Sequence, residues 1–234
     1  MIQRSEFQRE LESLQLEILK MGSKVEENIT RAITSLAEQD LKMVEEVFRV
    51  EEEVDRLEVK IEEQCLRLIA TQQPMAKDLR KIAAAFKIIT DLERMSDYSV
   101  DIAKVTQRIG SEPLIKPLVD LPRMADLAQK MVKDSLDAYV REDEHLALSL
   151  GKADDEVDIL HKQVFRELLV LMMENPRTIK QATHLLFVSQ SMERIADHAT
   201  NISESAIYLV TGKRVDLNDS LYPFPRKVEG NNSR

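Results

Sequence analysis

The sequence predicts an all-α protein built from two tandem, internally duplicated three-helix bundles, with six long antiparallel helices in total. Three observations support this fold class. Helix-forming residues dominate, with five glycines, no tryptophan and 32% charged residues. Apolar residues recur at spacings of three and four over long stretches. A segment near residue 93 returns about 100 residues later, as expected of a duplication.

The first bundle is predicted at residues 5–110. Apolar periodicity indicates one helix over 7–36, with Gly22 inside it, and a second from Leu41 to about residue 70, capped by Asp40. Pro74 is expected at the first position of the third helix, where its missing N–H costs nothing, and this helix continues to Ile109. Its buried line is expected at Leu79, Ile82, Phe86 and Ile89, with Glu93 in the same register.

The second bundle repeats this order at residues 123–212. Prolines and glycine over 111–122 predict a linker between the bundles. Helices are then expected over about 123–141, 144–173 and 176–210, with Asp143 capping the middle one. Residues 213–234 are polar and predict a loosely ordered tail.

Acidic residues recur at four-residue spacing on two helices of each half, so that they share a helix face. If the two helices face each other, the pairs Glu51/Asp55 and Asp154/Asp158 oppose acids of the third and sixth helices. Clustered carboxylates repel one another when ionised, which raises their pKa values, and a multivalent cation relieves this repulsion. Oxygen ligation favours Fe(III), Mn(II) or Mg(II) over a structural zinc site.

Two other interpretations compete with a metal site. Acids at this spacing often form only a solvated helix face, and Arg94 and Arg194 could pair with them instead. His161, three residues after Asp158, is a further candidate ligand. The single Cys65 is expected to pack in the core, which fits a reducing compartment.

Overall charge and hydropathy restrict the partners. A formal net charge of −9 argues against nonspecific binding to nucleic acid or anionic lipid. No apolar stretch is long enough to span a membrane, and the first residues do not resemble a signal peptide, so a cytosolic location is expected. Amphipathic helices of this length also favour self-association, which we expect as a homodimer.

The duplicated acidic motifs, the Glu112-Pro113-Leu114 linker and the Met172–Pro176 segment together resemble the PhoU family of phosphate-regulatory proteins. The resemblance implies a non-enzymatic adaptor that binds iron or zinc, with manganese or magnesium as alternatives. It also implies negative regulation of phosphate uptake and of the phosphate-starvation response, through contact with the phosphate ABC transporter ATPase and a sensor histidine kinase. The protein would then associate with the membrane only indirectly, through these partners.

The resemblance assigns nine metal ligands, which are Glu51, Asp55, Glu93, Asp97 and Asp101 in the first half and Asp154, Asp158, Glu193 and Asp197 in the second. Asn201 stands where the first half has Asp101, which predicts weaker binding in the second site. Two alternatives stay open at this point: a carboxylate-bridged metalloenzyme, and an accessory protein of a different phosphate transporter.

Overall fold

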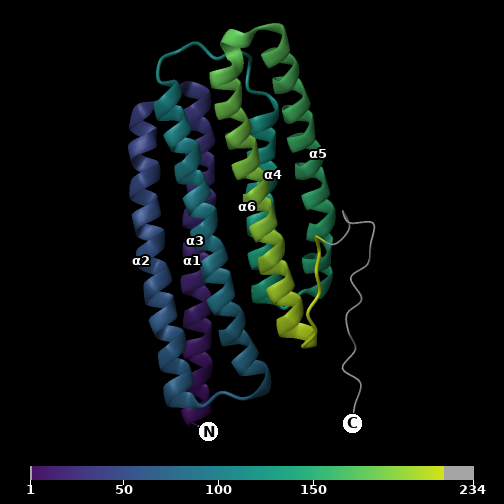
Figure 1. The fold of residues 1–234 in the computed structure, drawn as a ribbon. Helices are drawn as coiled ribbons and strands as arrows, with labels where there is room; N and C mark the ends of the chain where they lie inside the picture. Colours follow the sequence, from purple (N-terminus) through teal and green to yellow (C-terminus); the bar gives the residue numbers. More distant parts are fainter. Residues whose placement is uncertain (1, 219–234) are drawn as a thin grey trace.

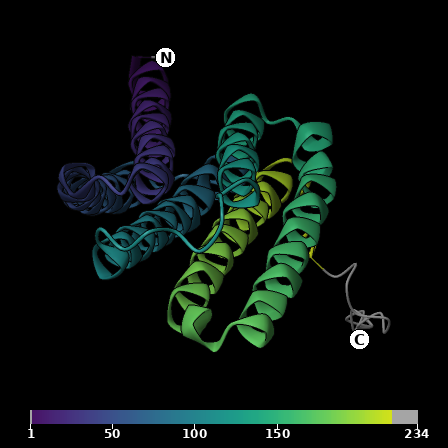
Figure 2. The same cartoon turned by 90° about the horizontal axis from the view of Figure 1, so that it is seen from above.

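Six long helices form two three-helix bundles that lie side by side (Figures 1 and 2). The computed structural model describes residues 2–218, and this part of the chain contains no β-strand. The helices are α1 (Ile2–Glu38), α2 (Leu41–Gln72), α3 (Ala76–Ile109), α4 (Asp120–Arg141), α5 (Glu144–Glu174) and α6 (Ile179–Thr211). The predicted fold class is confirmed.

Within each bundle every helix contacts the other two, and the bundles meet through the pairs α3/α6 and α1/α4. The core consists of the apolar stripes that the periodicity predicts; in α1 these include Leu14, Ile18 and Met21. Gly22 does not interrupt α1. A Cβ atom there would lie 2.1 Å from Leu136 Cδ1, so the glycine allows α1 and α4 to pack closely.

The predicted caps of both hairpins are confirmed. The Asp40 side chain accepts hydrogen bonds from the backbone N–H groups of Lys42 and Met43, and Asp143 accepts one from Leu146. Both side chains satisfy N–H groups that have no partner inside the helix. The short loops they close fix α1/α2 and α4/α5 as antiparallel neighbours.

Some predicted boundaries differ from the structure. Pro74 lies in the loop before α3, which begins at Ala76. Helix α4 begins at Asp120, inside the predicted linker, because a proline in the first turn, here Pro122, removes no intrahelical hydrogen bond. A 3₁₀ turn over Pro176–Thr178, capped by Asn175, precedes α6.

The linker is fixed to both bundles. Gln39 Nε2 donates hydrogen bonds to the carbonyls of Gly110 (2.8 Å) and Glu112 (2.7 Å). From the second bundle, Gln181 accepts one from the Ile115 N–H at 2.6 Å and donates one to Pro113 O at 3.1 Å. These bonds hold the crossover between the bundles in place.

Most of the predicted tail lies outside the described residues. The described part, residues 213–218, runs back along the second bundle, where Val215 and Leu217 pack against the core. The Leu217 N–H donates to Glu204 Oε1 at 2.9 Å. This segment therefore borders the acidic residues of α6.

Candidate metal-binding acid clusters

The structure brings the acids of α2 and α3 together, and those of α5 and α6. We call these the first and second acid cluster. The first contains Glu51, Asp55, Glu58, Glu93 and Asp97, and the second contains Asp154, Asp158, Glu193 and Asp197. Because the paired helices run antiparallel, Glu51 faces Asp97 and Asp154 faces Asp197. Eight of the nine residues predicted as ligands thus lie in the two clusters.

In the first cluster, burial and neighbouring carboxylates raise the pKa of Glu51, Glu58 and Glu93. The pKa of Glu51 is raised first by burial and then by Asp55 and Asp97. The pKa of Glu93 is raised by burial and by Asp97, while Arg94 lowers it. Arg94 contacts Glu93 at 3.4 Å and Asp97 at 3.3 Å, so the pairing predicted as a competitor of metal binding does form here.

The position of Glu93 differs from the sequence prediction. The buried stripe of α3 continues through Ala85, Ile88 and Leu92, so Glu93 lies beside the core rather than in it. Leu79, also expected in the stripe, is 42% exposed. The long α3 contacts both its own bundle and α6, so its buried face is broader than a single three-four line.

The second cluster is more deeply buried. Asp154 is 7% exposed, and its pKa is raised to about 7, first by burial and then by Asp197 and Asp158. The pKa of Asp197 is raised to about 6 by burial and by Glu193 and Asp158. Asp154 forms no ion pair with any residue of the described chain. Its charge is therefore poorly compensated.

Two polar contacts border the second cluster. Lys162 Nζ lies 3.1 Å from Asp158 Oδ2. Asn218, in the segment after α6, donates from Nδ2 to Asp197 Oδ1 at 3.1 Å. Arg194 instead points across to α3, where it donates to the Tyr98 hydroxyl at 3.3 Å and lies over its ring.

The ninth predicted ligand and its counterpart lie away from the clusters. Asp101 is exposed and pairs with Lys104 at 3.0 Å. Asn201 Nδ2 donates to Asp91 Oδ1 at 3.2 Å, and His198 Nδ1 lies 2.8 Å from the same oxygen. These residues belong to the α3/α6 interface, so Asp101 and Asn201 do not account for a difference between the clusters.

One acid of the first cluster was missed. Burial, then Asp55 and Glu62, raise the pKa of Glu58, and Asp97 also contributes. Its counterpart in the duplication is His161, whose Nδ1 lies 2.8 Å from Ser189 Oγ and whose pKa burial lowers. His161 was already a candidate ligand from the sequence, and its shared position in the repeat is the signal that could have identified Glu58 as well.

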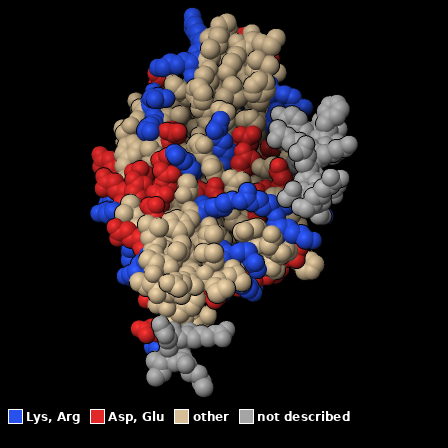
Figure 3. All heavy atoms as spheres, turned by 60° about the horizontal axis from the view of Figure 1, so that its bottom comes forward, with Lys and Arg blue, Asp and Glu red and all other residues tan. Residues whose placement is uncertain are grey.

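The donor set suits a hard or borderline cation, because it consists of carboxylate oxygens with one neutral imidazole nearby. In the observed side-chain conformations, no group of three Asp, Glu, His or Cys residues in residues 2–218 lies close enough together to coordinate one ion. Each cluster would need side-chain rotation to close on a metal. Figure 3 shows acidic side chains gathered in two places on one face of the molecule, with basic side chains beside and between them.

A six-helix protein formed by duplication, with facing carboxylates in each half, defines the structural class. Comparisons with known proteins agree with it. The family model described as "PhoU domain" matches residues 18–106 and again 121–206. The chain belongs to the PhoU family.

Curated relatives and solved structures extend the similarity to nearly the whole chain. A "phosphate-specific transport system accessory protein PhoU homolog" of Clostridium acetobutylicum is 44% identical over 214 residues, which cover 91% of this chain and 98% of that protein. The homolog of Aquifex aeolicus is 42% identical over a match that covers 88% of this chain and 94% of that protein. The crystal structure of PhoU from Pseudomonas aeruginosa matches with a TM-score of 0.84 and 36% identity, covering 88% and 100%.

The helices of residues 2–218 contain no apolar stretch of the length that a bilayer span requires. Cys65 is buried, and burial followed by Glu62 raises the pKa of its thiol to about 12. The thiol therefore stays protonated and packs in the core, as predicted.

Proposed function

We propose that this protein is a regulatory accessory protein of bacterial phosphate transport that binds metal ions through its two acid clusters. Membership of the PhoU family and the names of the C. acetobutylicum and A. aeolicus relatives support the role in phosphate transport. The finer proposal is a non-enzymatic negative regulator that contacts the ATPase of the phosphate transporter and a sensor histidine kinase. Both contacts would take place in the cytoplasm.

The burial of Asp154 is the observation that carries the metal-binding proposal. A carboxylate that is 7% exposed and faces Asp158, Glu193 and Asp197 loses hydration and gains repulsion when it ionises. A bound cation removes both costs, and iron, zinc, manganese and magnesium are the candidates. In the first cluster, Glu51, Asp55, Glu93 and Asp97 would hold the ion, with Glu58 beside them.

Metal content provides the direct test. We expect purified wild-type protein dialysed against Fe, Zn or Mn to retain metal, and Glu93→Ala/Asp97→Ala to lose the share held by the first cluster. Asp154→Ala/Asp197→Ala should lose the rest. Glu45→Ala, an exposed acid of α2 outside the clusters, is the matched control. Metal content that is unchanged in both double variants would refute the site.

Partner binding tests the regulatory part separately. The purified ATPase subunit of the phosphate transporter and the cytoplasmic part of the sensor kinase are immobilised, and binding of this protein is measured by interferometry. Binding to one or both supports the proposal, and binding to neither refutes it. Metal content does not enter this measurement, so the two parts can fail independently.

Self-association is a further part of the proposal. The outer face of α5 exposes Phe165 (48%), Leu169 (45%) and Met173 (77%) at four-residue spacing. Such an apolar stripe supports contact with another protein surface. Light scattering after size exclusion distinguishes the expected homodimer from a monomer, which would refute this part.

A further inference from the structure

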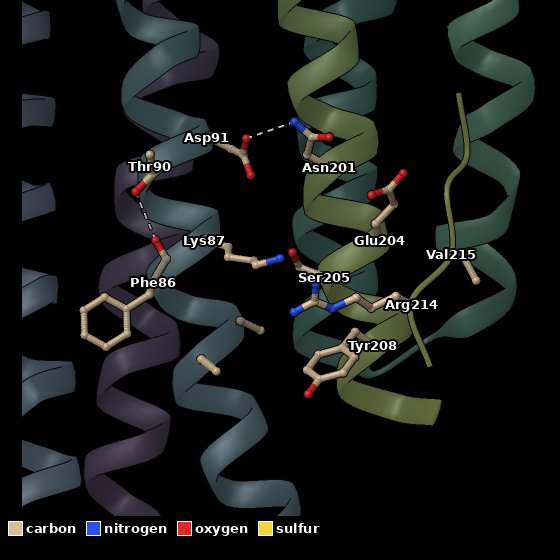
Figure 4. A pocket seen from close by; sticks show the side chains of 12 residues that line it. Phe86, Lys87, Thr90, Asp91, Asn201, Glu204, Ser205, Tyr208, Arg214 and Val215 are labelled. Atoms are coloured by element: carbon tan, nitrogen blue, oxygen red, sulfur yellow. Dashed lines mark hydrogen bonds between the residues drawn. The ribbon is translucent and has the colours of Figure 1, made fainter. Parts of the chain in front are cut away.

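A large cavity lies at the interface of the two bundles, where α3 meets α6. It has a volume of about 710 Å³ and is lined by α3, α6 and the segment after α6 (Figure 4). This volume is in the range of small-molecule sites, roughly 300–1,000 Å³, which often form at such interfaces. Ala83, Ala84, Tyr208 and Val215 give part of its wall an apolar character.

Two cations enter this cavity from different elements. Lys87 extends from α3 toward α6, and the guanidinium of Arg214 enters beside Ser205 (Figure 4). Arg214 lies over the Tyr208 ring at 6.0 Å. Within the described chain neither cation has an ion pair or a hydrogen bond. Asp91 and Glu204 of the same cavity offset part of this positive charge, but no direct contact with them holds either cation, so both can turn toward a bound anion.

The acids of the cavity are already engaged. Asp91 Oδ1 accepts a hydrogen bond from Asn201 and lies 2.8 Å from His198 Nδ1. Glu204 accepts a hydrogen bond from the Leu217 N–H. Burial raises the pKa of Glu204, although its hydrogen bond with Leu217 and the charge of Lys87 lower it. The cations are therefore the groups that remain available to a ligand.

The internal duplication supplies a comparison within the molecule. A second cavity on the other side of the α3/α6 contact is lined by the corresponding residues of the opposite halves, whose numbers differ by 100, such as Thr90 and Gln190. It is half as large, at about 350 Å³. Phe187 replaces Lys87 there, and no segment corresponding to Arg214 closes it. Cations also line the smaller cavity, at Lys104, Arg108 and Arg194, so the feature that distinguishes the larger cavity is its room for an organic ligand.

We propose that the larger cavity binds a small organic oxyanion, a phosphate ester or a carboxylate, between Lys87 and Arg214. The hydroxyl of Ser205 lies in the same wall and can donate to the oxyanion. The organic part would lie against Ala84, Val215 and the Tyr208 ring. The volume exceeds that needed by an inorganic ion, so a ligand with an organic part is expected.

Calorimetry on the full-length protein, treated with chelator to remove metal, tests this site. The probes are AMP as the phosphate ester, succinate as the carboxylate, and inorganic phosphate as the bare anion. We expect AMP or succinate to bind with a Kd below 1 mM, and whichever binds identifies the ligand class. Inorganic phosphate should bind at least about tenfold more weakly, because it lacks the apolar contacts.

Substitutions locate the binding. Lys87→Gln and Arg214→Gln should each weaken it about tenfold, the usual effect of losing one charged hydrogen bond. Arg108→Gln, which removes a cation from the smaller cavity, is the control and should leave the Kd unchanged. Thermal unfolding of each variant shows that it is folded. The proposal would be overturned if neither AMP nor succinate binds, or if inorganic phosphate binds as tightly as they do. It would also be overturned if Arg108→Gln weakens binding and Lys87→Gln does not.

Discussion

Asp154→Asn should have opposite effects on stability in the absence and in the presence of metal. Asparagine keeps the shape of the side chain and removes its charge. The pKa of Asp154 rises from 3.8 to about 7 in the folded protein. Each pKa unit is worth about 1.4 kcal/mol, so ionising Asp154 costs the folded state at most about 4 kcal/mol. Its neighbours relax part of this cost, and we expect about 2 kcal/mol.

The sign follows from proton linkage. Between the unfolded pKa and the folded pKa the native state binds more protons, so this group makes the protein less stable as the pH rises from about 4 to about 7. In chelator at pH 7.5, the Asn variant should therefore be more stable than wild type. At pH 4, near the unfolded pKa, the difference should nearly disappear.

Urea unfolding followed by circular dichroism measures the effect. With manganese at 100 times its Kd, wild type should gain about 2.7 kcal/mol, the free energy of saturating one site, and the variant much less. The order of stability then reverses. A variant that is less stable than wild type in chelator at pH 7.5 would refute the reasoning, because it would show that the charge of Asp154 is compensated within the protein.

Three further predictions concern the fold, and each is measured by urea unfolding. Asp40→Ala removes the cap of α2 and should cost about 1 kcal/mol; no change would mean that the cap is redundant. Ile61→Ala leaves a cavity in the buried face of α2 and should cost about 2–5 kcal/mol, against less than about 0.5 kcal/mol for alanine at the exposed Glu45. Gly22→Leu should cost about 1–3 kcal/mol by overpacking the α1/α4 contact at Leu136, and a neutral result would show that the helices can separate freely.

The sequence predicted the helices well because their periodicity is long and their caps are local. Asp40 and Asp143 cap helices through backbone atoms two or three residues away, so no tertiary knowledge is needed. Pro74 was misplaced because proline is equally compatible with a loop and with a first helical turn.

The periodicity predicted which acids share a helix face, but not which of them lie together in the folded protein. Four-residue spacing placed acids on one face of each helix, and the antiparallel hairpin brought those faces together. The spacing could not show that Asp101 lies outside the first cluster. The direction of the Asp101 side chain depends on how α3 is oriented about its axis between its own bundle and α6. For the same reason, the contact of Asp91 with His198 and Asn201 had no signal in the spacing.

The two acid clusters should release metal at different pH values, and the reason is burial rather than the exchange of Asp101 for Asn201. Metal must displace the protons that the free ligands carry. In the second cluster the pKa values of Asp154 and Asp197 are about 7 and about 6, so protons compete near neutrality. In the first cluster Glu51 and Glu93 are less buried than Asp154, and Arg94 lowers the pKa of Glu93.

Proteins with a single intact cluster isolate this difference. Glu51→Gln/Asp97→Asn retains only the second cluster, and Asp154→Asn/Asp197→Asn retains only the first. After equilibration with manganese at pH 6.0 and pH 7.5, elemental analysis should show the larger loss at low pH in the protein that retains the second cluster. An equal loss, or a larger loss from the first cluster, would mean that burial does not control the competition between proton and metal. The ordering expected here would leave the first cluster as the permanent site and make occupancy of the second depend on pH.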